Sequence, residues 1–309
     1  MLNVFFYSST ANWERYKSPL RAAFKKIGLK VTLRNDMPSE EVDYIILSNN
    51  NSLINFLPYK RLKAVLNLWA GVEHTAQNPT LQVPLTRMVD PAMTQGMIEW
   101  VTGHVLRHHL GMDAHINAVP GEWNQKAPPL AWQRKVAILG LGELGYPCAQ
   151  TLAQIGFIVH GWSRSPKLIN GIKSYHGEDG LVAALTGVDM VVLLLPATYE
   201  TENTLNAMTL NALKTGAVVI NPGRGHLIDD NALISALNCG QVSHATLDTF
   251  RTEPLPSEHP FWHHPKITVT PHIASESRPD SASQVIAQNI QRAETGQSLL
   301  HIVNQQLGY

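Results

Sequence analysis

Short apolar runs alternate with longer segments of helical spacing through the first ninety residues. Polar and turn-forming residues bound these runs, and we expect strands at residues 4–8, 31–35, 44–48, 64–69 and 86–89. Residues 13–27 carry apolar side chains at helical spacing between the first two runs. This alternation of strand and helix predicts a small α/β unit.

The pattern becomes helical between residues 91 and 110. Apolar side chains recur every four residues at Met93, Met97, Val101 and Val105, and Pro91 suits the first turn of a helix. We interpret this segment as a connecting helix. Residues 111–133 are rich in Pro, Gly, Asn and Trp and have no clear period, so we expect an extended excursion. Such excursions often form subunit interfaces.

From Lys135 onward, strand-like runs recur at residues 135–140, 157–162, 190–195, 217–221, 244–248 and 267–270. Six such strands match a doubly wound parallel sheet that binds a dinucleotide. The third and fourth runs are apolar without alternation, as expected of parallel strands buried on both faces. After these runs the sequence predicts a helix at about 275–296 and a return of residues 299–303 to the first unit.

The predicted fold class is therefore α/β with two domains. A doubly wound, dinucleotide-binding domain spans residues 96–274. A smaller, discontinuous, flavodoxin-like α/β domain for the substrate comprises residues 1–95 and 275–309.

Composition narrows the classes of partner. Twenty-four Lys and Arg residues balance 24 Asp and Glu residues, so no net charge draws the chain to nucleic acid or to an anionic membrane. The two cysteines, Cys148 and Cys239, argue against a disulfide framework or a Cys-rich zinc site. No apolar run reaches the roughly 18 residues of a membrane span, and we read no signal peptide. We expect a cytoplasmic protein that binds a small molecule.

A glycine-rich turn, GLGELG at residues 140–145, follows the strand 135–140. Gly140 permits a tight bend, Gly142 lets the backbone approach a pyrophosphate, and Gly145 allows close packing of helix and sheet. A helix starting near Glu143 offers its N–H groups to phosphate, and Leu144 belongs to the same cofactor-binding turn. The motif alone also occurs in methyltransferases and flavoproteins.

The residues expected to bind the adenine ribose are unusual. NAD enzymes of this fold place an acid about twenty residues after the turn, whereas this chain reads WSRSPK at residues 162–167. Arg164 can pair with a 2′-phosphate, and Ser163 and Ser165 can donate hydrogen bonds to it. The sequence therefore favours NADPH over NADH, although NADH is possible.

Three chemically suited residues follow three later strands. Arg224 lies between glycines in NPGRG (221–225), and a planar cation there can hold a carboxylate and polarise a carbonyl. His272 can deliver a proton to the carbonyl oxygen. Glu253 can hydrogen-bond to the imidazole, fix its tautomer and favour its charged form. We interpret these three as the catalytic residues.

The histidines at positions 104, 108 and 109 invite a metal interpretation, because an i, i+4 pair can share an ion. No Glu follows the first histidine as in a metalloprotease helix, and no further ligand pattern is evident. We expect no metal site.

These motifs carry a family resemblance. GLGELG, NPGRG, LDTFRTEPLP (247–256) and TPHIAS (270–275), in this order, resemble the D-isomer-specific 2-hydroxyacid dehydrogenases over nearly the whole chain. WSRSPK and the short C-terminus are most similar to the glyoxylate/hydroxypyruvate reductase A branch. The resemblance implies that Arg224 binds substrate, that His272 is the acid/base and that Glu253 is its partner.

The same resemblance implies roles for further residues in cofactor and substrate binding. Asp248 lies near the nicotinamide, and Leu195 and Pro196 line the adenosine side. The backbone of Ala70 and Gly71 holds the substrate carboxylate, together with Arg224 and His272, and the protein forms a homodimer.

The expected activity is NADPH-dependent reduction of a small 2-oxo acid, glyoxylate or hydroxypyruvate, to the (R)-2-hydroxy acid. One alternative is a reductase of bulkier 2-oxo acids such as phenylpyruvate. Another, of a different class, is a non-catalytic NAD(P)H-sensing interaction protein. A methyltransferase would use the glycine turn but would not need the Arg, Glu and His set.

Overall fold

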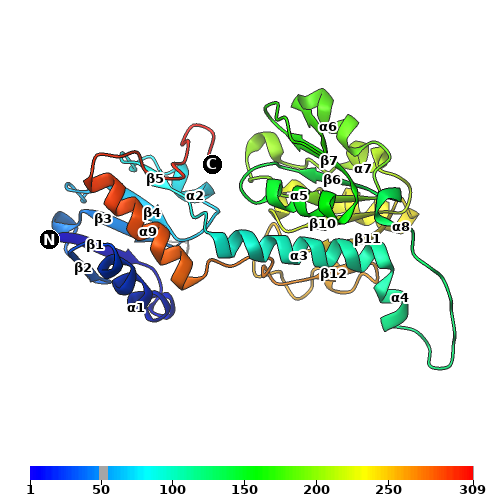
Figure 1. Cartoon of the computed structure of the whole chain (residues 1–309), viewed down its shortest axis with the longest axis horizontal. Coiled ribbons are helices and arrows are strands. Elements are labelled where there is room, and N and C mark those ends of the chain that lie inside the picture. The colour runs from blue at the N-terminus through cyan, green and yellow to red at the C-terminus, as the bar shows by residue number, and fades with distance from the viewer. Residues whose placement is uncertain (49–54, 309) are drawn as a thin grey trace. The chain divides into compact units, whose positions relative to one another are not determined.

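The computed structural model describes residues 1–48 and 55–308, and this part of the chain forms one five-stranded and one seven-stranded sheet (Figure 1). The chain divides into two compact units, Met1–Met93 with Glu276–Tyr309, and Thr94–Ser275. The boundaries expected from sequence, at 95/96 and 274/275, fall beside these. All strand pairs within both sheets are parallel. The predicted α/β class with two parallel sheets is confirmed.

The smaller unit has the strand order β2-β1-β3-β4-β5 of a flavodoxin-like sheet. Its strands are β1 (Leu2–Tyr7), β2 (Val31–Arg34), β3 (Tyr44–Leu47), β4 (Ala64–Asn67) and β5 (Leu85–Thr86). Its helices are α1 (Thr10–Lys26), α2 (Glu73–Ala76) and α9 (Pro279–Glu294). The end of the chain returns to this unit, because the Val303 N–H donates to the Leu85 carbonyl at 2.8 Å. The strand expected at residues 86–89 corresponds to β5, which is shorter and begins one residue earlier.

Helix α1 shows how the sequence specifies an element. The Ser9 side chain caps its start by accepting the Asn12 N–H at 3.2 Å. Tyr16, Leu20 and Phe24, at four-residue spacing, are buried on one face. Lys25 and Lys26 in the last turn suit the negative end of the helix dipole.

The larger unit has the strand order β12-β11-β10-β9-β6-β7-β8 of a doubly wound sheet. Its strands are β6 (Lys135–Leu139), β7 (Ile158–Ser163), β8 (Ile172–His176), β9 (Met190–Leu193), β10 (Ala217–Asn221), β11 (Val242–Leu247) and β12 (Ile267–Val269). Its helices are α4 (Met112–Ile116), α5 (Gly145–Ile155), α6 (Gly177–Leu185), α7 (Ala207–Ala212) and α8 (Asp230–Cys239). Helix α3 (Pro91–Leu110) coincides with the predicted connecting helix and runs into this unit from the end of the first segment.

Some elements differ from the expectation. The prediction of six strands missed β8, an edge strand whose residues are mostly partly buried or exposed. The excursion at 111–133 contains the short helix α4 and a 3₁₀ turn at Ala131–Gln133. The helix after the glycine turn begins at Gly145 rather than near Glu143, and α9 is shorter at both ends than the predicted 275–296.

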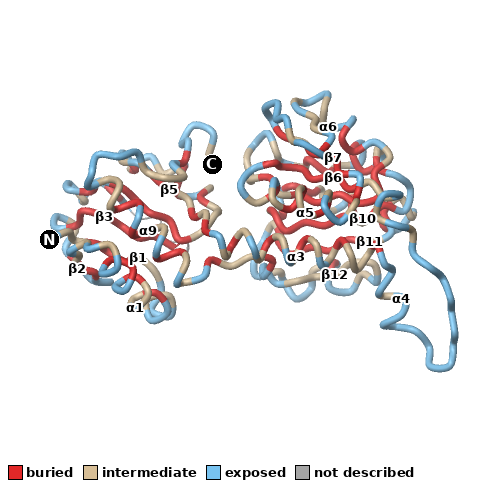
Figure 2. The backbone as a smooth tube through the Cα atoms, in the orientation of Figure 1, coloured by how far each residue is buried: buried red, intermediate tan, exposed pale blue. Residues whose placement is uncertain are grey.

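Two apolar layers sandwich the larger sheet. Alternate strand residues Leu139, Val191 and Leu193 belong to the core cluster that contains α7 and α8 side chains. Ile138 and Val192 face the other way, into the cluster with α3 and α5 side chains. Strands β9 and β10 are accordingly buried throughout, whereas most of residues 111–130 are exposed (Figure 2).

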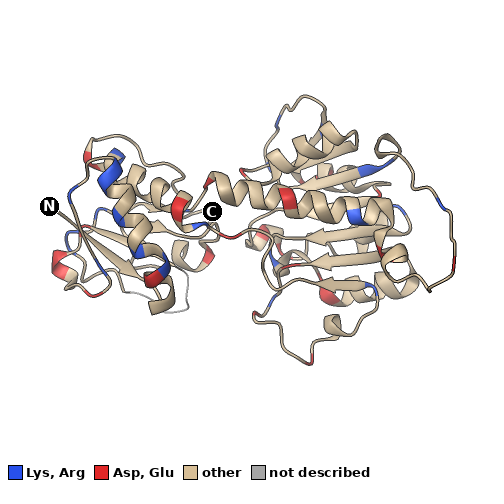
Figure 3. Ribbon diagram, turned by 60° about the horizontal axis from the view of Figure 1, so that its bottom comes forward, with Lys and Arg blue, Asp and Glu red and all other residues tan. Residues whose placement is uncertain are grey.

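Charged residues lie mainly on helices and loops, while the strands are largely free of them (Figure 3). Acidic and basic residues are interspersed. Among the described residues, no helix is long and apolar enough to cross a membrane.

Candidate active site

The carboxyl ends of the parallel strands of the larger unit carry all the predicted polar site residues of this unit. Gly140 follows β6 and has a φ of 103°, which favours glycine. A Cβ there would collide with the Leu194 carbonyl beyond β9, and a Cβ on Gly145 would collide with the Gly140 carbonyl. The two glycines therefore permit a turn that packs closely against the next strand end.

Gly142 differs from these two glycines. In the described part of the chain, no atom lies within 4 Å of a Cβ built on it, so its backbone faces open space. Leu144 is the N-cap of α5 and offers no side-chain cap there among the described residues. An accessible backbone at the start of an eleven-residue helix suits a pyrophosphate, so the turn fits a dinucleotide.

The segment predicted to bind the ribose follows β7. Ser163 is buried at the end of the strand, and its hydroxyl donates to the Ser165 carbonyl at 2.8 Å. Arg164 is exposed. Lys167 donates from Nζ to the Leu141 carbonyl at 2.5 Å, which ties this segment to the glycine turn. Ser163 thus shapes the turn, and its contact with a phosphate stays a prediction.

Leu195 and Pro196 follow β9 beside the glycine turn. Leu195 is buried, and its Cδ2 lies 3.1 Å from a Cβ built on Gly140. The Pro196 carbonyl accepts the Thr201 hydroxyl at 2.6 Å. Both residues therefore lie at the point where the strand order of the sheet reverses, where doubly wound sheets bind ligands.

His272 and Glu253 contact each other directly. Nδ1 of His272 lies 2.7 Å from Oε2 of Glu253, and Oε1 of Glu253 accepts the Phe250 N–H at 2.8 Å. Burial raises the pKa of the Glu253 carboxyl, but the hydrogen bonds from His272 and Phe250 and the charge of Arg224 outweigh it and hold the pKa below its ordinary value. The carboxylate is therefore ionised at neutral pH.

The loop that carries His272 is held by Asp248. The Asp248 carboxylate is fully buried and accepts the Thr270 hydroxyl at 2.6 Å and the N–H groups of Ile273 and Ala274 at 2.9 Å. His272 has a φ of 52°, and its N–H donates to the Asp248 carbonyl. The structure thus gives Asp248 a role in holding the loop, and its contact with the nicotinamide stays a prediction.

Arg224 extends from the loop after β10. Asn221 shapes this loop, because its Nδ2 donates to the Arg224 carbonyl at 2.9 Å and its Oδ1 accepts the Gly223 N–H at 3.1 Å. Nη1 of Arg224 donates to the Gly223 carbonyl at 2.7 Å. Asn221 was not among the residues predicted from sequence, although its place at the strand end in NPGRG is a usable signal.

Ala70 and Gly71 belong to the smaller unit and follow β4. The buried Asn67 holds their loop, since its Nδ2 donates to the Trp69 carbonyl at 3.0 Å and to the Gly71 carbonyl at 2.8 Å. This asparagine, too, was not predicted from sequence as part of the site.

No group of three or more His, Cys, Asp or Glu side chains in residues 1–48 and 55–308 is arranged to hold a metal ion. His108 instead contacts the Thr246 hydroxyl at 2.9 Å, and its ring lies 4.9 Å from that of His244.

Comparison with known proteins identifies the family. The model of the D-isomer specific 2-hydroxyacid dehydrogenase NAD binding domain matches residues 103–274. The chain belongs to this family. The resemblance drawn from the motifs is thereby confirmed, and this 2-hydroxyacid dehydrogenase is an NAD(P)-dependent oxidoreductase rather than a methyltransferase.

Full-length relatives of the dehydrogenase are known. It is 38% identical to glyoxylate/hydroxypyruvate reductase A of Serratia proteamaculans, over 100% of both chains. A D-isomer specific 2-hydroxyacid dehydrogenase from Xanthobacter autotrophicus Py2, in complex with NADPH and MES, superposes with a TM-score of 0.90 at 38% identity and covers 100% of this chain and 99% of its own. An NADPH-dependent glyoxylate/hydroxypyruvate reductase from Sinorhizobium meliloti, in complex with NADP and sulfate, gives 0.87 at 33% identity over 100% of both chains.

Proposed function

We propose that this dehydrogenase uses NADPH to reduce glyoxylate or hydroxypyruvate to the corresponding (R)-2-hydroxy acid, glycolate or D-glycerate. The observation that carries the substrate class is the full-length similarity to proteins named glyoxylate/hydroxypyruvate reductase A. The Arg, Glu and His set at adjoining strand ends supports the reaction, because reduction of a 2-oxo acid needs a carboxylate anchor and a proton donor.

Each proposed residue has a distinct task. Arg224 anchors the substrate carboxylate and stabilises the negative charge that develops on the carbonyl oxygen. His272 delivers a proton to that oxygen from Nε2, because Nδ1 is committed to Glu253. Glu253 holds the ring in one orientation through its contact with Nδ1. The backbone of Ala70 and Gly71 contributes to carboxylate binding.

NAD(P)H supplies the hydride when it is bound. Gly140, Gly142, Leu144 and Gly145 would hold its pyrophosphate, and Leu195 and Pro196 its adenosine side. Arg164, with Ser163 and Ser165, would bind the 2′-phosphate. The exposed Arg164 at the end of β7, where an acid is missing, supports the preference for NADPH, and so do the relatives that bind NADPH or NADP.

The activity is tested by following the absorbance of NADPH with glyoxylate, hydroxypyruvate and phenylpyruvate, and by repeating each assay with NADH. Fast turnover of a small 2-oxo acid with NADPH supports the proposal. Preference for phenylpyruvate points to the bulkier-substrate alternative, because only the pocket for the substituent differs. Binding of NADPH without turnover of any 2-oxo acid would instead favour the sensing alternative.

A homodimer is part of the proposal. The excursion after α3 exposes apolar side chains, including Ile116 at 74%, Val119 at 60% and Trp123 at 91%. Several exposed apolar side chains on one segment are costly in water and suit a subunit interface.

A further inference from the structure

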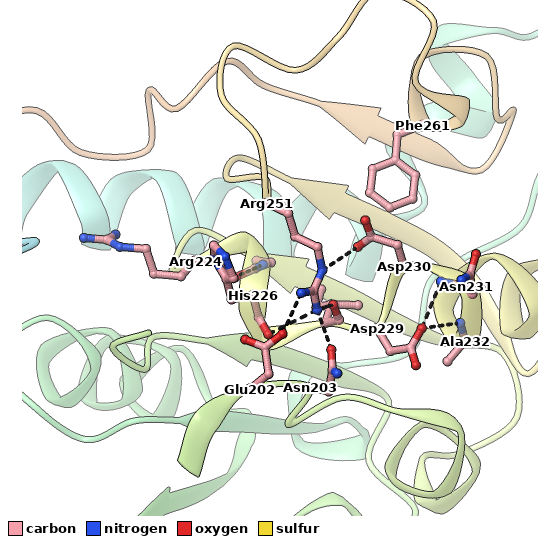
Figure 4. A network of polar contacts seen from close by, with 12 residues as sticks. Glu202, Asn203, Arg224, His226, Asp229, Asp230, Asn231, Ala232, Arg251 and Phe261 are labelled. Atoms are coloured by element: carbon pink, nitrogen blue, oxygen red, sulfur yellow. Dashed lines mark hydrogen bonds and ion pairs between the residues drawn. The ribbon is translucent and has the colours of Figure 1, made fainter. Parts of the chain in front are cut away.

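Arg251 joins three loops at the carboxyl ends of β9, β10 and β11. Its Nη1 donates to Oε1 of Glu202 at 2.6 Å, and its Nη2 donates to Oδ1 of Asn203, both in the loop after β9. The same Nη2 donates to the Ile228 carbonyl at 2.5 Å, in the loop after β10, and Nε lies 3.8 Å from Oδ1 of Asp230. Figure 4 shows the guanidinium at the centre of this network.

The loops that carry Arg224 and Glu253 also touch through their backbones. A Cβ on Gly225 would collide with the backbone of Phe250 and Arg251, so the residue after Arg224 packs directly beneath the segment that precedes Glu253. Phe250 in turn donates its N–H to Glu253. A shift of the loop after β10 would therefore displace Phe250, and with it the Glu253 carboxylate that contacts His272.

The loop after β9 completes the connection. The Asn203 N–H donates to the His226 carbonyl at 2.9 Å, and the Leu205 N–H donates to the Leu227 carbonyl at 2.9 Å. Arg251 therefore contacts the Arg224 loop directly at Ile228 and at the His226 carbonyl, which lies 3.4 Å from Nη2, and indirectly through the side chain of Asn203, which that loop's backbone already holds.

We propose that Arg251 is a positioning residue that sets the spacing between Arg224 and the Glu253–His272 pair. The inference rests on the proposed roles of these three residues. A guanidinium suits this task because its planar, fixed donors can reach acceptors on several loops at once, whereas the single ammonium of lysine cannot match them. Side-chain exposure is 31%, so the network is only partly screened by water.

The test compares Arg251→Met with Arg251→Lys in the full-length enzyme on its best 2-oxo acid. For Arg251→Met we expect KM for the 2-oxo acid to rise about 10-fold and kcat to fall about 10-fold, because small misplacements of catalytic groups cost up to about 100-fold. Arg251→Lys keeps the charge and should recover part of both losses. The Kd for NADPH, measured by fluorescence titration, should stay within about 2-fold, since the glycine turn lies at a different strand end.

A purely structural role gives a different result. Partial unfolding lowers kcat in proportion to the folded fraction and leaves KM for the 2-oxo acid unchanged. That outcome, or wild-type values of both parameters in Arg251→Met, would overturn the inference. Arg61→Met is the matched control, because Arg61 also forms an ion pair, with Asp43 at 2.9 Å, but does so in the smaller unit. It should change neither parameter.

Arg224→Gln separates this inference from the proposed function. If Arg224→Gln leaves KM for the 2-oxo acid unchanged, the assigned role of Arg224 fails, and Arg251 has no such residue to position. If Arg224→Gln raises KM strongly while Arg251→Met does not, the role of Arg224 stands and the inference about Arg251 alone is wrong.

Discussion

Oε2 of Glu253 lies 2.7 Å from Nδ1 of His272, and the other carboxylate oxygen accepts the Phe250 N–H at 2.8 Å. One carboxylate oxygen is thus held by the backbone of its own loop, while the other orients the imidazole. A ring held at Nδ1 can exchange a proton with a substrate only through Nε2, which defines the geometry of the proposed proton transfer.

His272→Ala should lower kcat by about 10²- to 10⁴-fold, the range typical of a lost general acid. Binding of NADPH, followed by fluorescence titration, should be retained because the glycine turn is unaffected. His263→Ala is the control, since this exposed histidine precedes β12 and has no assigned role. Turnover above about a tenth of the wild-type rate in His272→Ala would remove this residue from the mechanism.

Glu253→Gln keeps the size of the side chain and removes its charge. The pKa of Glu253 lies below its ordinary value, so the charge is present at neutral pH and is lost only as pH falls through that lowered pKa. Without it the His272 ring loses its ionic partner, and we expect kcat/KM for reduction to fall about 10- to 100-fold and to lose the acid-side decline that protonation of Glu253 causes in the wild type. The pH profile of kcat/KM for reduction measures this. A profile that matches Glu258→Gln, an exposed acid on the same loop, contradicts the assignment.

Arg164→Ala should reduce kcat/KM for NADPH by about 10-fold or more and change kcat/KM for NADH by less than about 2-fold, because only NADPH carries the 2′-phosphate. Lys173→Ala, an exposed cation on β8 of the same sheet, controls for a general loss of positive charge. Equal losses with both cofactors would place Arg164 outside the 2′-phosphate site.

The histidines between α3 and β11 should make the larger unit sensitive to acid. Burial is the main cause that lowers the pKa of His108 from 6.5 to about 3, and His244 and Arg107 lower it further. The folded state then binds fewer protons than the unfolded state below about pH 6.5, so stability falls as pH drops from 6.5 toward 3, by about 1–2 kcal/mol near pH 5.

His108→Gln can keep the contact with Thr246 without titrating. Its Tm should therefore fall less than the wild-type Tm between neutral pH and about pH 5, measured by calorimetry. Identical acid-induced losses of Tm in the two proteins would mean that His108 does not carry the effect.

The exposed apolar side chains in residues 111–133 predict a homodimer. Sedimentation equilibrium should give twice the 34.1 kDa mass of the chain. Substituting Ile116 and Trp123 together by serine should shift the mass toward that of the monomer. A monomeric wild type at all concentrations would refute the homodimer.

Periodicity predicted the central strands well, because buried parallel strands such as β9 and β10 are continuous apolar runs. It failed at β8, an edge strand in which Lys173 is exposed and Ser174 and Tyr175 are only partly buried. An edge strand needs few apolar residues, so its sequence resembles a loop. Exact helix starts, as at Gly145, depend on turn geometry that spacing does not encode.

Within the site, single residues at strand ends could be found from sequence, and contacts between loops could not. Arg224, Glu253 and His272 stand out because each follows an apolar run. Asn221 contacts the Arg224 loop from within it, whereas Arg251 contacts loops that lie far apart in the chain. Only the strand order of the folded sheet makes the loops after β9, β10 and β11 neighbours.

The Asp248 carboxylate also determines how the segment after β12 exchanges its amide hydrogens. The N–H groups of Ile273 and Ala274 donate to the fully buried Asp248 carboxylate. Breaking either hydrogen bond leaves a buried carboxylate oxygen without that donor, which costs free energy. Deuterium should therefore enter these two amides only when the β11–β12 edge opens as a unit, although Ile273 itself is 59% exposed. We therefore expect the segment that carries His272, although accessible to solvent, to exchange its amide hydrogens as slowly as the core of the sheet.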